Sequence, residues 1–329
     1  MTIVVPYTLT LDGFDSLAPS WSGLLPRCKG NSVFLTPQWQ QAWWRHFGTG
    51  EPLLLSVCQQ GKLAGVAPLM RTPDGLSLLG SSDVCDYLDF IAPPEHADGV
   101  CQAVLGFVHS LEWKRFDLFS LPEGSVALEH FLPLATGRGY EVRVEQEDVC
   151  PRLDLPQRWE DYLSLLAKKD RHELRRKQRR LVKEPGAACE VMPGGETLGR
   201  DMGSFLALFR DSQTRKAEFL TPPMSAFFKD IALVASQMGW LRLSFLSIAG
   251  ARVSTVLGFD YGDTFYMYNS GYDQRYSHLS VGLLLKAQCI QQSIASGKRR
   301  FDFLRGREAY KYDLGGLDRP VYRCSITRS

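Results

Sequence analysis

The residues best suited to catalysis lie together near the C-terminal end, in the segment FDFLRGREAYK at positions 301–311. Side chains alternate along a strand, so Phe301 and Phe303 would face one side and Asp302 the other. If an amine attacks a carbonyl carbon, a carboxylate must take the proton of the amine. Asp302 or Glu308 can do so once burial raises its pKa.

Cations and phenols near the same segment extend this candidate site. Arg305 and Lys311 suit the phosphate or carboxylate groups of a substrate, because both side chains are donors with a positive charge. Tyr310 or Tyr272 can protonate a leaving group. Asn269 is a further expected substrate contact. The alternative for the whole set is a structural ion-pair network at a strand end.

The stretch QRYSHLSVG at positions 274–282 predicts an anion site before a helix. Ser280 can act as N-cap, and Gly282 permits close approach of the backbone. Unpaired amides and the helix dipole favour an anion at this place. The alternative is that these two residues only begin a packed helix. The expected donor contacts are Arg275, Tyr276, Ser280, Val281 and Gly282.

The segment 159–184 has the strongest helical periodicity in the chain. Because successive residues of a helix turn by about 100°, this segment has an apolar side and a basic side. It forms either one helix or two helices that break near residues 169 and 170. The basic stripe suits a tRNA, a nucleotide-linked sugar or a membrane phosphate, with Arg171 and Arg175 as expected substrate contacts, or it is a solvated face. The stripe consists of Lys168, Arg171, Arg175, Arg179 and Lys183.

An acidic cluster lies in the first half, where Asp83, Asp86, Tyr87 and Asp89 fall within seven residues. Asp86 and Tyr87 are the expected contacts of a cationic or sugar-bearing acceptor, held in a cleft between two lobes. A loop with exposed acids is the alternative.

Apolar periodicity and turn residues predict the elements that position these side chains, in a mixed β and α order. In the first half we expect helices at 37–47 and 97–111, a hairpin at 52–72, and strands at 76–80, 87–94, 115–123, 140–144 and 152–155. In the second half we expect helices at 197–214, 226–238 and 280–296, and strands at 240–250, 251–263, 264–272 and 299–306.

Length and composition bound the architecture. The 329 residues exceed one typical domain, so we predict an α/β protein with mixed (α+β) sheets in two lobes, 1–155 and 156–329, with the last strand left open to return to the first lobe. The 38 Lys and Arg residues nearly balance the 36 Asp and Glu residues, which excludes a global attraction to nucleic acid or anionic lipid.

Targeting and metal motifs are not found in the sequence. The eight cysteines form no close pair and the histidines no ligand spacing, so we predict no metal and mostly buried, reduced thiols. The first residues do not resemble a secretory signal, and no apolar run is long enough to span a bilayer. We expect a cytoplasmic protein, free or peripheral to the inner membrane face.

The stretch from YMYNSGYDQRYSHLSVG to FDFLRGREAYKYDLGG resembles the acetyltransferase domain of the BioF2-like or CelD-like group within the GNAT superfamily. The basic helix ending RRKQRRL and the segment LGSSDVCDYLDFIAPP resemble further parts of that group. Together these segments cover most of the chain from about residue 34 to 316.

This resemblance implies two tandem GNAT-like lobes with the acyl-CoA N-acyltransferase fold, an arrangement shared with the Fem peptidyltransferases. It implies transfer of an acyl group from acyl-CoA or acetyl-CoA to an amine, such as an amino sugar or a cell-envelope or polysaccharide precursor. In GNAT enzymes the donor pyrophosphate lies on the loop that corresponds to 274–282. That loop has one of the two usual glycines, so an aminoacyl-tRNA donor and a non-catalytic binding module stay open as alternatives. The sequence leaves the oligomeric state open.

Overall fold

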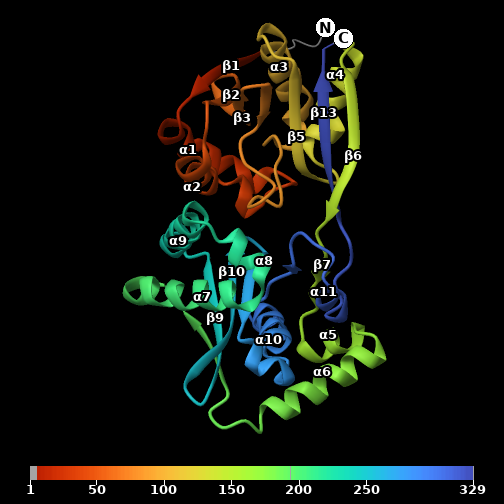
Figure 1. Cartoon of the computed structure of the whole chain (residues 1–329). Helices are drawn as coiled ribbons and strands as arrows, with labels where there is room; N and C mark the ends of the chain where they lie inside the picture. The colour runs from red at the N-terminus through yellow and green to blue at the C-terminus, as the bar shows by residue number, and fades with distance from the viewer. Residues whose placement is uncertain (1–5, 193, 329) are drawn as a thin grey trace. The chain divides into compact units, whose positions relative to one another are not determined.

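The computed structural model describes residues 6–192 and 194–328, which divide into two compact units. Unit 1 ends at Asp148 and resumes at Arg319, and unit 2 is the chain between them. Each unit contains one mixed sheet with helices on it, which is the predicted α/β class (Figure 1). The predicted division after residue 155 remains a proposal for the domain boundary.

The sheet of unit 1 has seven strands in the order β1-β2-β3-β4-β5-β13-β6. The last strand of the chain pairs antiparallel with β5, so residues far apart in sequence share this sheet. The bounds are β1 Tyr7–Asp12, β2 Glu51–Gln59, β3 Lys62–Thr72, β4 Gly75–Leu78, β5 Arg115–Pro122, β6 Glu141–Val149 and β13 Pro320–Thr327.

The predicted hairpin is present as β2 and β3, and its turn residues Gln60 and Gly61 both have positive φ, at 52° and 72°. The predicted helices at 37–47 and 97–111 are α2 and α3. Trp39 and Trp43 of α2 are buried. The helices of this unit are α1 Phe14–Leu24, α2 Pro37–Phe47, α3 Ala97–Ser110 and α4 Leu132–Gly137, and a π-helical turn at Ala127–Phe131 precedes α4.

The predicted strand at 87–94 is wrong, because this segment forms an isolated bridge between Ile91 and Val66 and a hydrogen bond from Leu88 to Ser120, and no continuous strand pairing. Its path is fixed by Asp89, whose buried carboxylate accepts hydrogen bonds from the amides of Phe90, Val126 and Ala127 at 2.7–2.9 Å. Burial raises the pKa of Asp89 to about 7. Asp89 is therefore a structural group of unit 1.

The sheet of unit 2 has six strands in the order β7-β12-β11-β10-β9-β8. The predicted meander at 240–272 is β9, β10 and β11, and β7 pairs with β12 in this sheet. The elements β1, α1, α4, β8, α8 and α11 were not predicted from the sequence. The bounds are β7 Arg152–Asp154, β8 Ala188–Met192, β9 Leu241–Ile248, β10 Ala251–Tyr261, β11 Thr264–Tyr272 and β12 Arg300–Asp302.

Helices cover both faces of this sheet (Figure 1). On one face α10 packs on β9, β10 and β11 and also contacts α5 and α6, and on the other α7 and α9 contribute a cluster of aromatic rings. The bounds are α5 Trp159–Leu165, α6 Lys168–Leu181, α7 Leu198–Ser212, α8 Thr214–Phe219, α9 Pro222–Gln237, α10 Val281–Ala295 and α11 Ala309–Asp313.

The basic segment 159–184 forms two helices, and the break lies at Leu166 and Ala167, slightly before the position considered from the sequence. Arg171 closes this junction, because its guanidinium donates to the carbonyls of Leu163 and Leu166 at 3.3 and 3.4 Å. Arg175 forms an ion pair with Glu160 at 2.9 Å. Both arginines thus join α6 to α5.

A bulge interrupts β11. Met267 pairs with Gly258 and Asn269 with Leu257, so Tyr268 is an extra residue opposite β10. One extra residue reverses the alternation of side chains beyond it. Before the bulge Met267 packs in the core under α10, and after it Tyr272 packs against that core.

We predict that Gly271→Ala destabilises unit 2 by about 3 kcal/mol, because the new methyl group would lie 2.4 Å from the carbonyl oxygen of Leu208 in α7. The matched control is Gly203→Ala in α7, where no atom lies within 4 Å and the gain in helix propensity should stabilise by about 0.5–1 kcal/mol. Urea unfolding measures both variants. Equal stability of the two would contradict the close approach of α7 to β11.

Candidate active site

Two neighbouring strands of unit 2, β11 and β12, separate after a short parallel pairing. β11 and β12 pair only from Thr264–Tyr266 with Arg300–Asp302, although β11 continues to Tyr272. From Met267 onward, this edge of β11 has no strand partner among the described residues. Within the described part of the chain, no neighbouring strand closes that edge, although the Ser270 carbonyl of β11 accepts a hydrogen bond from Lys216.

A tight turn carries the chain away from β11 after β12. Asp302 is buried, and its carboxylate accepts a hydrogen bond from the amide of Leu304 at 2.8 Å. Leu304 and Gly306 both have positive φ, at 60° and 110°. Arg305 lies between them and is half-buried.

Lys311 holds this turn closed. Its buried amine donates to the carbonyls of Leu304, Arg305 and Gly306 at 2.8, 2.6 and 3.1 Å and lies 3.0 Å from the Glu308 carboxylate. An amine has three protons to donate, and these partners use them all. Because its donors are committed to the backbone, we do not assign Lys311 the predicted role in binding a substrate phosphate or carboxylate.

A second buried lysine, Lys286, lies beside the first turn of α10. Its amine donates to the carbonyl of Gly282 at 3.2 Å and lies 4.6 Å from the ring centroid of Tyr310. The residue is 6% exposed, and burial lowers the pKa of Lys286 to about 7, with the charge of Lys216 acting in the same direction. This amine can gain or lose a proton near neutral pH.

Gly282 leaves space between two of these groups. A Cβ at this position would lie 3.1 Å from the Tyr272 ring and 3.7 Å from the Lys286 amine. The predicted approach of a donor anion to the Gly282 backbone remains a proposal. Tyr272 thus lies at the same end of α10 as Lys286 and Tyr310.

Lys216 of α8 and Glu308 complete the cluster. The Lys216 amine donates to the carbonyl of Ser270 on β11 at 2.6 Å, and burial lowers its pKa to about 8. The carboxylate of Glu308, whose side chain is 57% exposed, acts on the pKa values of Lys216, Lys286 and Tyr310. Burial, and then this carboxylate, raise the pKa of Tyr310 well above its ordinary range, so its phenol stays protonated.

The start of α10 supplies donors toward an anion. Ser280 is the N-cap residue, as predicted, but it has a φ of 58° and its side chain makes no capping hydrogen bond. The amides of Val281, Gly282 and Leu283 form the first turn, where a helix has no internal acceptors. Their positive partial charge suits a phosphate group.

Arg275 and Tyr276 belong to the short helical turn before α10. The side chain of Arg275 is 85% exposed and pairs with Asp273 at 2.6 Å, which raises the pKa of Arg275. Tyr276 packs against the core that also holds Tyr272 and Tyr310. Tyr276 therefore packs in unit 2, whereas Arg275 faces solvent.

The other predicted contacts lie elsewhere. Alternation after the bulge places Asn269 with Gly271 on the α7 side of β11, opposite to Tyr272. In the described ranges, no hydrogen bond or ion pair joins Arg171 or Arg175 to the cluster at α10.

The two predicted acceptor contacts of the first half, Asp86 and Tyr87, lie in unit 1. Tyr87 is buried with its ring 6.0 Å from that of Phe34, and Asp86 is half-buried. Their role in acceptor binding remains a proposal.

Lys216 and Lys286 were missed by the sequence analysis. Lys286 carried a usable signal, because it is the one cation of α10, whose sequence VGLLLKAQCIQQSIA is otherwise uncharged. Burying a charged residue at a core position of an apolar helix costs free energy unless the charge is paired, so such a residue is a candidate for a functional role. Lys216 stands among polar residues in TRKAEF, where nothing distinguishes it.

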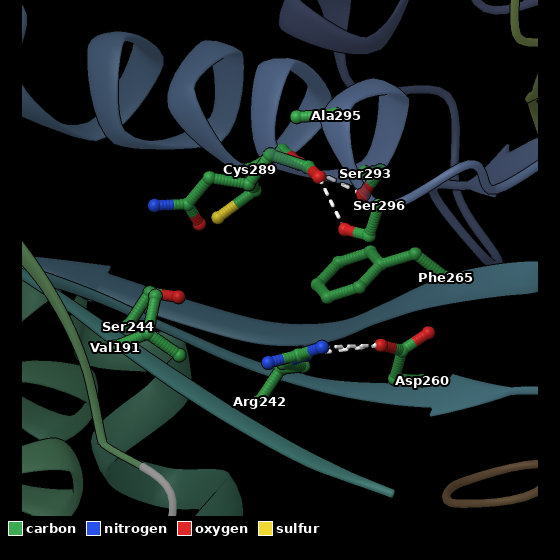
Figure 2. Close-up of a pocket in the computed structure, with 10 residues that line it drawn as sticks. Val191, Arg242, Ser244, Asp260, Phe265, Cys289, Ser293, Ala295 and Ser296 are labelled. Atoms are coloured by element: carbon green, nitrogen blue, oxygen red, sulfur yellow. Dashed lines mark hydrogen bonds and ion pairs between the residues drawn. The ribbon is translucent and has the colours of Figure 1, made fainter.

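A separate hollow of about 340 Å³ lies between the C-terminal half of α10 and strands β8 to β11 (Figure 2). Its charged lining residues, Arg242 and Asp260, pair with each other at 2.7 Å. Burial raises the pKa of the Cys289 thiol to about 12, so this sulfur is not a thiolate at neutral pH. None of the predicted site residues lines the hollow.

Neither a metal-binding cluster nor a membrane-spanning helix is found among the described residues. Within residues 6–192 and 194–328, no group of three or more His, Cys, Asp or Glu side chains is arranged to hold a metal ion. No helix in those ranges combines the length and apolar character needed to cross a membrane.

We predict that Lys286→Met raises the stability of the protein in acid. The folded-state pKa of Lys286 lies below its ordinary value of 10.5, so the cost of burying the charge is complete below about pH 7 and fades as the pH rises toward 10.5. Each pKa unit corresponds to about 1.4 kcal/mol. Thermal unfolding should show a higher midpoint for the variant at pH 6 and a shrinking difference toward pH 10. A variant less stable at every pH would contradict this prediction.

Lys311→Met should have the opposite effect, although this lysine is equally buried. The change leaves three carbonyl groups without their donor, and we expect a loss of about 3 kcal/mol or more at neutral pH. Urea unfolding at pH 7 measures the loss, with Lys286→Met as the matched control. If both variants shifted stability in the same direction at pH 6, the different environments of the two amines would be disproved.

The second half of the chain resembles a known protein family. Residues 168–312 match the family model described as an acetyltransferase (GNAT) domain. That range contains α6, the strands from β8 to β12, and the cluster formed by Lys216, Tyr272, Lys286, Glu308 and Tyr310. No curated protein sequence matches the chain.

Solved structures with similar folds extend over nearly the whole chain. FemX has a TM-score of 0.66 at 10% identity, with 96% of each chain covered. The C-terminal domain of a putative lysylphosphatidylglycerol synthetase from Agrobacterium fabrum has a TM-score of 0.59 at 10% identity, covering 96% of this chain and 93% of that one. A tandem GNAT protein from the clavulanic acid biosynthesis pathway has a TM-score of 0.50 at 11% identity, covering 98% and 99%. Residues 168–312 are therefore similar to GNAT acetyltransferase domains, and the chain has the tandem GNAT-like fold.

Proposed function

We propose that unit 2 is an N-acyltransferase that moves an acyl group from acyl-CoA, such as acetyl-CoA, to an amine. The observation that supports this most strongly is the separation of β11 from β12 directly beside the first turn of α10. The separation leaves a free strand edge, and Lys286, Glu308 and Tyr310 lie around it.

The first turn of α10 binds the phosphates of the donor in this proposal. The amides of Val281, Gly282 and Leu283 point toward an anion at this position, and no side-chain cap competes for them. The free edge of β11 then receives the rest of the donor, and its amides polarise the carbonyl group. Gly282 keeps the space beside Tyr272 and Lys286 open.

Glu308 is the proposed proton acceptor. As the nitrogen of the amine bonds to the carbonyl carbon and the carbon–sulfur bond breaks, one proton passes from nitrogen to the Glu308 carboxylate. The departing sulfur receives a proton from Lys286, whose pKa of about 7 suits exchange at neutral pH, or from the protonated phenol of Tyr310 or Tyr272. Asp302 is not assigned this role, because its carboxylate holds the turn after β12.

The acceptor is an amine, and the sequence resemblance favours an amino sugar or a cell-envelope or polysaccharide precursor in the cytoplasm. FemX shares the fold at 10% identity, which supports the architecture and leaves the donor to be tested. An aminoacyl-tRNA donor is the second candidate, and the loop with one glycine, Gly282, favours it.

Thermal unfolding with acetyl-CoA, longer acyl-CoAs and free CoA tests the donor. A ligand at about 100 times its Kd adds about 2.7 kcal/mol to stability, which should raise the midpoint by several degrees. Gly282→Val fills the space beside Tyr272 and should abolish the rise, whereas Glu308→Gln should keep it and lower the rate of acetyl transfer to a panel of amino sugars at least about 100-fold.

Glu190→Gln is the control for the carboxylate, because Glu190 is exposed on β8, the opposite edge of the sheet. Its transfer rate should equal that of the unmodified protein. No rise with any CoA species would reject acyl-CoA as donor and favour aminoacyl-tRNA. A rise with full transfer in Glu308→Gln would keep the donor site and remove Glu308 as the base.

A further inference from the structure

The outer surface of α6 is cationic along its whole length. Successive residues turn by about 100°, which places seven basic side chains within an arc of about 140° and no acidic side chain among them. The opposite side of the helix carries Leu174 and Leu181, which pack in the core. The seven residues, here named the α6 surface, are Lys168, Lys169, His172, Arg175, Arg176, Arg179 and Arg180.

Six of these side chains are exposed, and Arg180 is half-buried. Arg175 pairs with Glu160 and Arg176 with Glu173, at 2.9 and 2.7 Å. In the part of the chain that the structure describes, no ion pair compensates Lys168, Lys169 or Arg179. Like charges one turn apart repel each other, so this arrangement is costly to the isolated protein. An external polyanion would remove the cost.

Large apolar side chains are exposed at both ends of the helix. Leu165, the last residue of α5, is 68% exposed, and Val182, which follows α6, is 81% exposed. Basic residues combined with exposed apolar side chains are typical of segments that lie on an anionic membrane, where the apolar groups enter the acyl boundary. RNA would leave both side chains in water, and α6 offers no Phe, Tyr or Trp ring on which a base could stack.

We propose that the α6 surface, with Leu165 and Val182, docks the protein on an anionic phospholipid bilayer. α6 has 14 residues and is about 21 Å long, so its cations can contact several lipid head groups at once. This surface is formed by residues separate from the cluster at α10. The inference therefore does not depend on the proposed reaction.

Co-sedimentation with vesicles tests the proposal on the full chain. The protein should pellet with vesicles of phosphatidylcholine containing a minority of phosphatidylglycerol, and not with phosphatidylcholine alone. Binding should weaken as salt is added, because the Debye length shrinks. The triple variant Lys169→Glu, Arg176→Glu and Arg179→Glu should bind roughly a hundredfold more weakly.

The matched control reverses three exposed cations of unit 1, Lys62→Glu, Lys114→Glu and Arg138→Glu, with the same change in net charge. It should bind like the unmodified protein. The double variant Leu165→Ser and Val182→Ser should weaken vesicle binding about tenfold. Unchanged thermal midpoints would establish that every variant is folded.

Three outcomes would overturn the proposal. The first is equal vesicle binding by the α6 variant and the control. The second is vesicle binding that does not require phosphatidylglycerol. The third uses bulk tRNA as a probe: if the unmodified protein binds tRNA and not vesicles, and the α6 variant loses tRNA binding, the α6 surface is an RNA site.

Discussion

Three backbone carbonyls and one carboxylate converge on the buried amine of Lys311, and the candidate site of unit 2 depends on that convergence. The amine holds the chain in a turn with positive φ at Leu304 and Gly306, conformations that cost energy for most residues. Because the chain turns there, β12 cannot follow β11 beyond Asp302. The free edge of β11 follows directly, and Glu308 and Tyr310 are carried to it by the same turn.

The two buried lysines of this region show how the same side chain serves two purposes. Lys311 uses every proton it can donate and is a structural cation. Lys286 has one hydrogen bond and an aromatic face, so burial is not compensated and its pKa falls to about 7. A fully paired charge stabilises a turn, whereas an incompletely paired one can exchange protons. The difference in function follows from the number of acceptors around each amine.

The bulge in β11 has a comparable effect on the other wall of the site. If Tyr268 were a regularly paired residue of the strand and not a bulge, Tyr272 would face α7 and not α10. With the bulge, Tyr272 reaches the side of Gly282, and Gly271 lies where α7 approaches closely. One residue in the register therefore decides which phenol can take part in the reaction.

The sequence by itself determined the features that depend on local patterns. Periodicity located α2, α3 and α10, the hairpin of β2 and β3, and the meander of β9 to β11, because each has its own apolar face or turn residues. The segment 301–311 was predicted to contain catalytic and substrate-binding residues, because carboxylates, cations and a phenol lie close together in its sequence. The family model of the GNAT acetyltransferase domain matches residues 168–312, which include the stretches that carry the resemblance.

Tertiary structure alone decided what each of those side chains does. The segment 87–94 has the composition of a strand. Its path is nevertheless fixed by hydrogen bonds that the Asp89 carboxylate accepts from the amides of Val126 and Ala127, which follow it by 37 and 38 positions in the sequence. Lys311 and Lys286 cannot be told apart by type, because their roles depend on acceptors supplied by the folded backbone. Lys216 donates a hydrogen bond to the Ser270 carbonyl of β11, which lies 54 residues later in the sequence. Local propensity determines the elements, whereas the dielectric and the hydrogen-bond partners of a buried charge exist only after the chain has folded.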